Sequence, residues 1–225
     1  MYKGITLSAS LMCVNWLELK TQLKDLEANY IDYLHIDIID GLFAPDFTMG
    51  SSITNLVNKK CCLKSDFHLM AEEPSRLYNA FNFRKVDRLT IHQEACRNLH
   101  RDIVNIKKNY CEVGVALCPG TNIETLEYII EDVNVVLLMT VDPGYMGQPL
   151  VPQVLKKIQK VVNLRREFSL DFNIAVDGNV SIENIPKMIE CGADTLVLGT
   201  SSLFKDNQTI SQSVADIHSA IDLVK

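Results

Sequence analysis

The six residues YLHIDI, numbered 33 to 38, alternate aliphatic side chains with other side chains along their whole length. A period of two is typical of a β-strand, in which successive side chains point to opposite faces. The leucine and the two isoleucines fall on one face, which suits packing against helices, and Tyr33, His35 and Asp37 fall on the other. The stretch therefore predicts a strand with ionisable groups on the face that turns away from the helices.

Short runs of the same kind lie on both sides of this strand, and longer amphipathic runs separate them. The predicted strands span Ile5–Ser10, Tyr33–Ile38, Leu63–Leu69, Arg88–Ile91, Glu112–Leu117, Val135–Met139, Asn173–Val176 and Thr195–Leu198. The predicted helices span Trp16–Ala28, Ser52–Lys59, Ser75–Phe81, Asn98–Lys108, Ile123–Glu131, Val151–Arg166, Ile182–Glu190 and Ile210–Val224.

Strict alternation of strand and helix predicts a parallel sheet with right-handed crossovers. Eight such units in 225 residues match the size of a (β/α)8 TIM barrel. No linker or repeat divides the sequence, so we expect one barrel domain over residues 1–225. An open doubly wound sheet is the alternative, but no G-x-G-x-x-G follows the first strand, where a dinucleotide-binding sheet carries it.

Composition narrows the classes of function. Hydrophobic residues make up 47% and charged residues 22%, which is ordinary globular usage. The net charge is −6 and no Lys/Arg-rich stripe is present, which argues against a nucleic-acid partner. No apolar run approaches the ~20 residues that span a bilayer. Seven cysteines without C-x-x-C spacing indicate reduced, buried thiols, so we expect a cytoplasmic protein without membrane or nucleic-acid partners.

Ionisable side chains lie toward the carboxyl ends of three predicted strands: His35 and Asp37, then His68, then Asp177. In a barrel these ends meet at one rim, where active sites form. Burying the four groups without partners would cost free energy, and a divalent cation would provide a partner for all of them. Two imidazoles and two carboxylates suit Zn, Mn, Fe(II) or Co. One His-x-Asp pair alone is common in ordinary cores, so the convergence of three strands is what predicts one metal ion per subunit.

Glycine-containing loops follow the last three predicted strands. They are Gly144-Tyr145-Met146-Gly147, Gly178-Asn179 and Gly199-Thr200-Ser201. Such loops can present backbone N–H groups to an anion, and barrels often bind phosphate after strands 7 and 8. Tight turns between strand and helix are the alternative for any single loop, and the set of three favours a phosphate site.

Six ordered segments resemble the ribulose-phosphate 3-epimerase family, and the resemblance runs from about Ile5 to Phe204. The segments are Ser10-Leu11-Met12, His35-Ile36-Asp37-Ile38-Ile39-Asp40-Gly41, His68-Leu69-Met70, Met139-Thr140-Val141-Asp142-Pro143-Gly144, Val176-Asp177-Gly178 and Gly199-Thr200-Ser201. Within the family, SLMC near the start, MTVDPG followed by GQP, and GTSSLF look most like the D-allulose-6-phosphate 3-epimerase branch.

The resemblance implies a metal-dependent barrel epimerase that inverts C3 of a phosphorylated 2-ketose. The substrate pair is D-allulose 6-phosphate and D-fructose 6-phosphate, or D-ribulose 5-phosphate and D-xylulose 5-phosphate. It also implies a homo-oligomer, either a dimer or a hexamer. Matched by motif, the metal ligands are His35, Asp37, His68 and Asp177, and the acid/base pair is Asp37 and Asp177. The matched substrate contacts are Ser10, His68, Gly144, Tyr145, Met146, Gly147, Asp177, Gly178, Asn179, Gly199, Thr200 and Ser201.

The sequence departs from the family pattern at a few positions. Met is common in the family where Ile39 stands, Asn at Asp46, a second Gly at Asn179 and Asn at Cys118. Met146 replaces a common small residue, which leaves the length of the substrate open.

The chemistry of C3 inversion agrees with the two aspartates. The C3 proton lies α to the C2 carbonyl, and its removal places charge on O2, which a metal ion would stabilise as an enediolate. Inversion needs removal from one face and return to the other, so we expect Asp37 as the base and Asp177 as the acid in one direction. A sugar-phosphate lyase of the same barrel group and a non-catalytic sugar-phosphate binder are the alternatives. The lyase patterns need a lysine that is missing here, and a binder would not need both aspartates.

Overall fold

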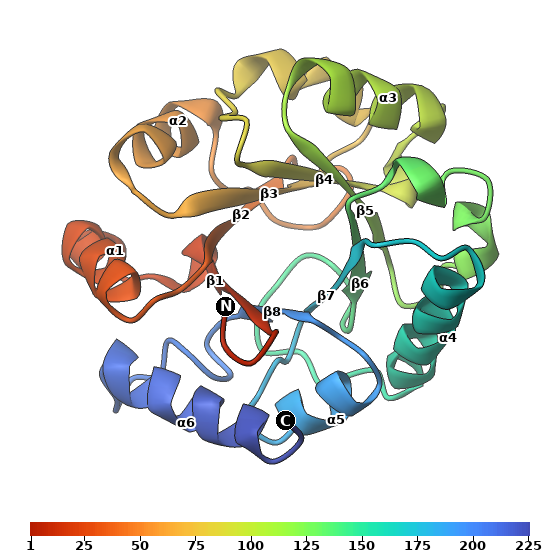
Figure 1. The fold of residues 1–225 in the computed structure, drawn as a ribbon. Coiled ribbons are helices and arrows are strands. Elements are labelled where there is room, and N and C mark those ends of the chain that lie inside the picture. Colours follow the sequence, from red (N-terminus) through yellow and green to blue (C-terminus); the bar gives the residue numbers. More distant parts are fainter.

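The computed structural model describes residues 1–225 as eight parallel strands that close into a barrel (Figure 1). The strands are β1 (Thr6–Ser10), β2 (Tyr33–Ile39), β3 (Lys64–Met70), β4 (Arg88–His92), β5 (Glu112–Leu117), β6 (Val135–Met139), β7 (Asn173–Asp177) and β8 (Thr195–Leu198). They pair in sequence order, and β8 returns to β1. The predicted (β/α)8 TIM barrel is confirmed, with every strand end within one residue of its expected position, and the open sheet is excluded.

Six α-helices surround the barrel on its outside (Figure 1). They are α1 (Leu19–Ala28), α2 (Ser51–Lys60), α3 (Leu99–Asn109), α4 (Gln153–Glu167), α5 (Ile185–Glu190) and α6 (Ile210–Asp222). None of the helices combines the length and the apolar content that crossing a membrane requires.

Two predicted helices are wrong, since Ser75–Phe81 and Ile123–Glu131 form only short 3₁₀ turns. The first region contains the turns Pro74–Arg76 and Tyr78–Ala80, and the second contains Ile123–Leu126 and Ile130–Asp132. Buried side chains lie three residues apart in both regions, at Tyr78 and Phe81 and at Ile123 and Leu126. Because a 3₁₀ turn has three residues per turn, this spacing points both members of each pair at the core without an α-helix.

The two faces of the strands build two different cores. Outward-facing residues such as Leu34, Ile36 and Phe67 join the helices in one continuous apolar layer. Inside the barrel, the half formed by β5 to β8 is filled by a small apolar cluster of Ala116, Val135, Leu137, Met139, Ala175 and Val197. The half formed by β1 to β4 instead buries polar side chains, namely Ser8, Ser10, His35, Asp37, Asp66, His68, Arg88, Thr90 and His92. The interior therefore provides a polar pocket against an apolar wall.

Asp40, directly after β2, ties two loops together at the carboxyl end of the barrel. Its Oδ1 accepts hydrogen bonds from the backbone N–H groups of Leu42 and Phe43, both at 2.9 Å, and its Oδ2 accepts one from Glu72 at 2.9 Å. Burial alone raises the pKa of this carboxyl, but the backbone donors at Phe43, Leu42 and Glu72 outweigh it and lower the pKa. The loop after β2 is thereby held against the loop after β3, beside the pocket.

Replacing this carboxylate should reduce stability in a pH-dependent way. In Asp40→Asn an NH₂ group faces a backbone N–H, and we expect a loss of about 1 kcal/mol in the free energy of unfolding. Because the folded pKa of Asp40 is lowered, its contribution is full above the unfolded pKa near ~4 and is lost as the pH falls through the folded value. Urea unfolding of both proteins between pH 7 and pH 3 measures this difference.

The matched control for this test is Asp25→Asn on the exposed side of α1. A loss in Asp40→Asn that is the same at pH 3 as at pH 7 would contradict the assignment to an ionised, hydrogen-bonded carboxylate.

Candidate active site at the carboxyl end of the barrel

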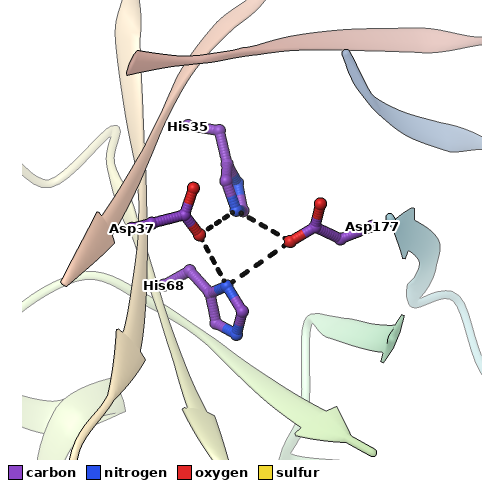
Figure 2. A group of neighbouring side chains, drawn as sticks. All are labelled: His35, Asp37, His68 and Asp177. Carbon is purple, nitrogen blue, oxygen red and sulfur yellow. Dashed lines mark hydrogen bonds and ion pairs between the residues drawn. The ribbon is translucent and has the colours of Figure 1, made fainter. Parts of the chain in front are cut away.

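Four ionisable side chains from three strands converge in the polar half of the barrel (Figure 2). His35 and Asp37 come from β2, His68 from β3 and Asp177 from the last position of β7. One donor atom from each lies within 4.8 Å of the donor atoms of the other three. The structure thus brings together the four residues that the sequence predicts as metal ligands.

The donor atoms form a closed ring of short contacts around a common centre. Asp37 Oδ1 lies 3.2 Å from His35 Nε2 and 3.0 Å from His68 Nδ1. Asp177 Oδ2 lies 3.6 Å from each of the same two nitrogens. In Figure 2 the two carboxylates stand on opposite sides of the pair of imidazoles. The two aspartates therefore approach the centre from different strands and different directions.

Strand register explains how the histidines and aspartates meet. In the parallel pair β2 and β3, His35 lies beside Asp66 and Asp37 lies beside His68. The strands carry the opposite orders His-x-Asp and Asp-x-His, so each imidazole has a carboxylate next to it on the inner face. Asp177 completes the set from across the barrel.

Asp66 sets the orientation of the His35 ring, although the sequence analysis did not single it out. Its Oδ2 lies 2.9 Å from His35 Nδ1 and also accepts a hydrogen bond from Ser8 Oγ at 3.1 Å. Because a carboxylate only accepts, Nδ1 carries a proton, and Nε2 is the nitrogen that points toward the centre. The sequence could have pointed to Asp66, because it lies two residues before His68 and therefore on the same face of the strand.

The Nε2 atom of His35 is a buried polar atom without a hydrogen-bond partner. Such an atom is costly unless something satisfies it. Burial lowers the pKa of His35, but the charges of Asp37 and Asp66 dominate and raise the pKa above its usual range. The surroundings therefore favour positive charge at this point, and the donor set fits a divalent cation.

Asp37 and Asp177 differ in their surroundings. Asp37 is buried, and its Oδ2 accepts a hydrogen bond from Ser10 Oγ at 3.2 Å. Burial raises the pKa of Asp37, yet the nearby charge of His35 and the hydrogen bond from His68 Nδ1 overcome this and hold the pKa well below its usual range. The Asp177 side chain is 17% exposed and lines the cavity above the ring of donors.

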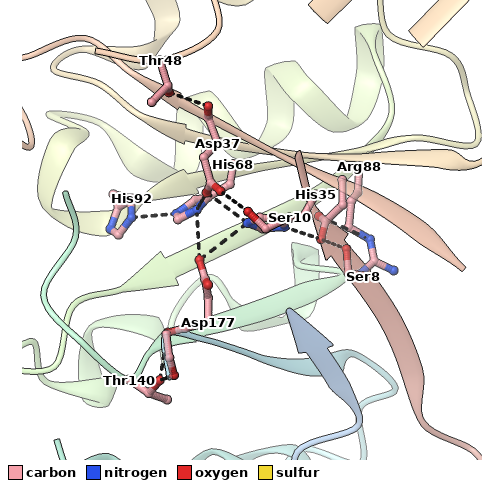
Figure 3. A network of polar contacts seen from close by, with 12 residues as sticks. Ser8, Ser10, His35, Asp37, Thr48, His68, Arg88, His92, Thr140 and Asp177 are labelled. Atoms are coloured by element: carbon pink, nitrogen blue, oxygen red, sulfur yellow. Dashed lines mark hydrogen bonds and ion pairs between the residues drawn. The ribbon is translucent and has the colours of Figure 1, made fainter. Parts of the chain in front are cut away.

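The other ring nitrogen of His68, Nε2, contacts His92 rather than a carboxylate. His68 Nε2 and His92 Nε2 lie 2.9 Å apart, and His92 Nδ1 lies 3.1 Å from Glu94 Oε2 (Figure 3 shows the first contact). Burial lowers the pKa of His92 to about 4. His92 is thus a neutral ring at neutral pH, and neither it nor Glu94 was assigned a definite role from the sequence.

The predicted substrate segments surround one cavity at the carboxyl ends of the strands. Its lining includes Ser10, Asp37, Asp177, Gly144, Tyr145, Met146, Gly147, Gly178, Asn179, Gly199, Thr200 and Ser201. His35 and His68 lie fully buried beneath it. All the loops expected near the substrate are therefore next to the candidate metal site.

Two departures from the family pattern have structural explanations. Asn179 has φ +44°, in the left-handed region that Gly and Asn adopt most readily. Its Nδ2 also donates to Gln148 O at 2.7 Å, which joins the loop after β7 to the loop after β6. Ile39 is buried beside Met70 as part of the apolar edge of the cavity, so it takes no part in ligation.

Comparisons with known proteins agree with this geometry. The model of the "Ribulose-phosphate 3 epimerase family" matches residues 6–204. A Bacillus subtilis (strain 168) protein named "Ribulose-phosphate 3-epimerase" is 40% identical over 198 residues, which cover 88% of this chain and 91% of the relative. Proteins of the same name from Methanocaldococcus jannaschii and Escherichia coli (strain K12) are 36% and 30% identical, covering 90% and 88% of this chain and 86% and 89% of the relatives.

Solved structures with low sequence identity share the fold alone. KGPDC from Streptococcus mutans has a TM-score of 0.65 at 14% identity over 98% of both chains. N-(5'-phosphoribosyl)anthranilate isomerase from Pyrococcus furiosus has a TM-score of 0.63 at 14% identity, covering 98% of this chain and 100% of that one.

The match over residues 6–204 and the similarity to named relatives over most of the chain lead to one identification. The chain belongs to the ribulose-phosphate 3-epimerase family, and it is an epimerase, an enzyme of the isomerase class.

Proposed function

We propose that this epimerase inverts C3 of a phosphorylated 2-ketose by a two-base mechanism that depends on a divalent metal ion. The observation that carries the proposal is the pair Asp37 and Asp177, which face each other at the base of one cavity. For the substrate pair we propose D-ribulose 5-phosphate and D-xylulose 5-phosphate, because the relatives described above are named for ribulose phosphate. The D-allulose 6-phosphate branch, favoured by local motifs, stays a prediction, as does a homo-oligomer.

The two carboxylates can act on opposite faces of a planar intermediate. The pKa of Asp37 is held low by His35 and His68, so Asp37 is ionised and is assigned as the base that removes the C3 proton. Asp177, on the other side of the cavity, is assigned as the acid that returns a proton to C3. In the reverse direction the two roles exchange. Ser10 Oγ, which donates to Asp37 Oδ2, keeps the base oriented.

The proposed ligands of the metal ion are His35 Nε2, His68 Nδ1, Asp37 Oδ1 and Asp177 Oδ2. Two imidazole nitrogens and two carboxylate oxygens suit Zn, Mn, Fe(II) or Co. When bound, the cation supplies a Lewis acid that stabilises negative charge on the C2 oxygen. The unpartnered Nε2 of His35 supports this placement.

The phosphate group is proposed to lie against the loops after β7 and β8. The backbone N–H groups of Gly178, Asn179 and Ser201 make no backbone hydrogen bond, and all three residues line the cavity. Free N–H groups of this kind bind anions without a positively charged side chain. Gly144 to Gly147 would cover the substrate from the loop after β6.

The two-base assignment predicts the isotopic outcome of turnover in D₂O. Wild-type enzyme should place one deuterium at C3 of the product, and Asp37→Asn and Asp177→Asn should each lower epimerisation about 10²- to 10⁴-fold. NMR of the C3 signal measures both quantities, and Asp171→Asn, an exposed site before β7, is the control. Product that keeps the hydrogen of the substrate, or epimerisation at the wild-type rate in either variant, would refute the scheme.

Metal dependence predicts a link between cation binding and stability. The metal-free protein should gain thermal stability on titration with Zn²⁺, since a ligand that binds only the folded state stabilises it. His35→Ala should lose this gain in stability, whereas His100→Ala, at an exposed position of α3, should keep it. Because the cation displaces the proton that Asp37 and Asp66 favour on His35, apparent affinity should rise with pH. An equal gain in His35→Ala would place the cation elsewhere.

Substrate length is tested by comparing kcat/KM on the two phosphates. One additional carbon in a fitted pocket changes kcat/KM by about 10- to 200-fold. We expect D-ribulose 5-phosphate to be preferred by a factor in this range. A preference of that size for D-allulose 6-phosphate would instead support the branch that the motifs predict.

A further inference from the structure

Both proposed acid/base residues lie where their strand has lost one of its two neighbours. Asp37 comes two residues after His35, the last residue of β2 that pairs with β1. Asp177 comes one residue after Val176, the last residue of β7 that pairs with β8. Only one strand still pairs with each aspartate, β3 with Asp37 and β6 with Asp177. The backbone at each carboxylate is therefore held by fewer strand contacts than the middle of the barrel.

Thr48, in the loop after β2, holds the backbone at Asp37 (Figure 3). Its Oγ1 donates a hydrogen bond to the backbone carbonyl oxygen of Asp37 at 2.6 Å and accepts one from the backbone N–H of Ile39 at 3.0 Å. Its own backbone N–H donates to Ile39 O at 3.3 Å, and the adjacent Phe47 forms an antiparallel bridge with Asp40. The returning loop thus takes the place of a neighbouring strand at the end of β2.

Thr140, directly after β6, makes the corresponding contact at Asp177 (Figure 3). Its Oγ1 donates toward the backbone carbonyl oxygens of Asp177, at 2.9 Å, and of Gly178, and its backbone N–H donates to Asp177 O at 2.7 Å. A Cβ at Gly178, which has φ +109°, would lie 3.0 Å from this hydroxyl oxygen and 2.5 Å from Val141 Cγ2. The close approach of the hydroxyl to the chain after Asp177 therefore requires glycine.

We propose that Thr48 and Thr140 are positioning residues, whose hydroxyls fix the backbone of Asp37 and Asp177 so that the two carboxylates face each other across the cavity. The inference rests on the two-base mechanism proposed above. Neither threonine lines the cavity, so each acts through its aspartate. An aspartate side chain is short, and its carboxylate moves with its backbone. A displacement of about 1 Å at a reacting group can lower a rate about 10²-fold.

A purely structural role is the competing interpretation, because threonine hydroxyls often bind backbone groups in turns and helices. Such a role predicts a loss of stability, with turnover by the folded enzyme unchanged. Thr54 of α2 represents this role in the same chain. It is fully buried away from the cavity, and its Oγ1 donates toward the carbonyl oxygens of Gly50 and Ser51, at 3.4 and 3.3 Å. Thr54→Val is therefore the matched control.

Valine and serine variants test whether the hydroxyls matter for turnover. Thr48→Val and Thr140→Val remove the hydroxyl and keep the shape of the side chain, and we expect each to lower kcat about 10- to 100-fold, with a smaller effect on KM. Thr48→Ser and Thr140→Ser keep the hydroxyl and should restore most of the activity, and Thr54→Val should leave kcat unchanged. Equal kcat in the folded valine and serine variants at a position would overturn the role of that threonine.

The primary isotope effect of substrate deuterated at C3 separates positioning from a general loss of packing. Asp37 removes the C3 hydrogen in one direction of turnover, and Asp177 removes it in the other. Slower removal makes this step a larger part of the overall rate, which increases the isotope effect. We expect Thr48→Val to increase it in one direction and Thr140→Val to increase it in the opposite direction. An increase in the same direction for both variants, or in neither direction, would overturn the proposal.

These outcomes are distinguishable from a failure of the proposed function. Wild-type product that keeps the substrate hydrogen in D₂O would remove the two-base mechanism and this inference with it. Deuterium at C3 together with unaltered isotope effects in the valine variants would overturn the threonine roles alone. If a valine variant does not fold, Thr48→Ala or Thr140→Ala also lacks the hydroxyl and carries the same prediction for the isotope effect.

Discussion

Three carboxylates bring negative charge into the barrel, and the rest of the site has to compensate that charge. Asp37 and Asp66 are buried, and Asp177 joins them from the opposite wall. Buried carboxylates stay ionised only beside positive charge or hydrogen-bond donors. Arg88 supplies part of this charge, with its Nε 3.9 Å from Asp66 Oδ1 and its guanidinium over the Tyr33 ring. A cation between the two imidazoles would supply the remainder, at the point where the chemistry of C3 inversion needs it.

Strand register and the alternation of side chains along the strands, rather than loops, place histidines beside these carboxylates. Inward positions on β2 and β3 alternate histidine and aspartate in opposite orders, so neighbouring strands pair unlike groups. On the next two strands, Gly114 of β5 makes room for the Thr90 side chain of β4, since a Cβ at Gly114 would clash with Thr90 Oγ1. The apolar cluster of β5 to β8 fills the other side of the barrel interior. Rigid strands therefore hold the proposed acid/base pair, and the glycine loops surround the cavity.

The sequence predicts the fold and the convergence of the four candidate ligands because both depend on a period of two. The alternation in residues 33–38 and the carboxyl-end position of Asp177 are visible without coordinates, and the barrel brings such ends together. The helices expected at Ser75–Phe81 and Ile123–Glu131 are wrong, because apolar spacing of three and four residues does not distinguish a short 3₁₀ turn from an α-helix. Glu94 could not be predicted, since it lies beyond β4 on a turn whose direction depends on tertiary contacts with the loop after β5.

Anomalous diffraction from crystals of the enzyme loaded with Zn²⁺ would locate the cation in the barrel. We expect one strong peak per chain, bound by His35 Nε2, His68 Nδ1, Asp37 and Asp177. A peak on His92 Nδ1, Glu94 and Cys118, or a centre between the two imidazoles that stays free of metal at saturating Zn²⁺, would contradict this placement.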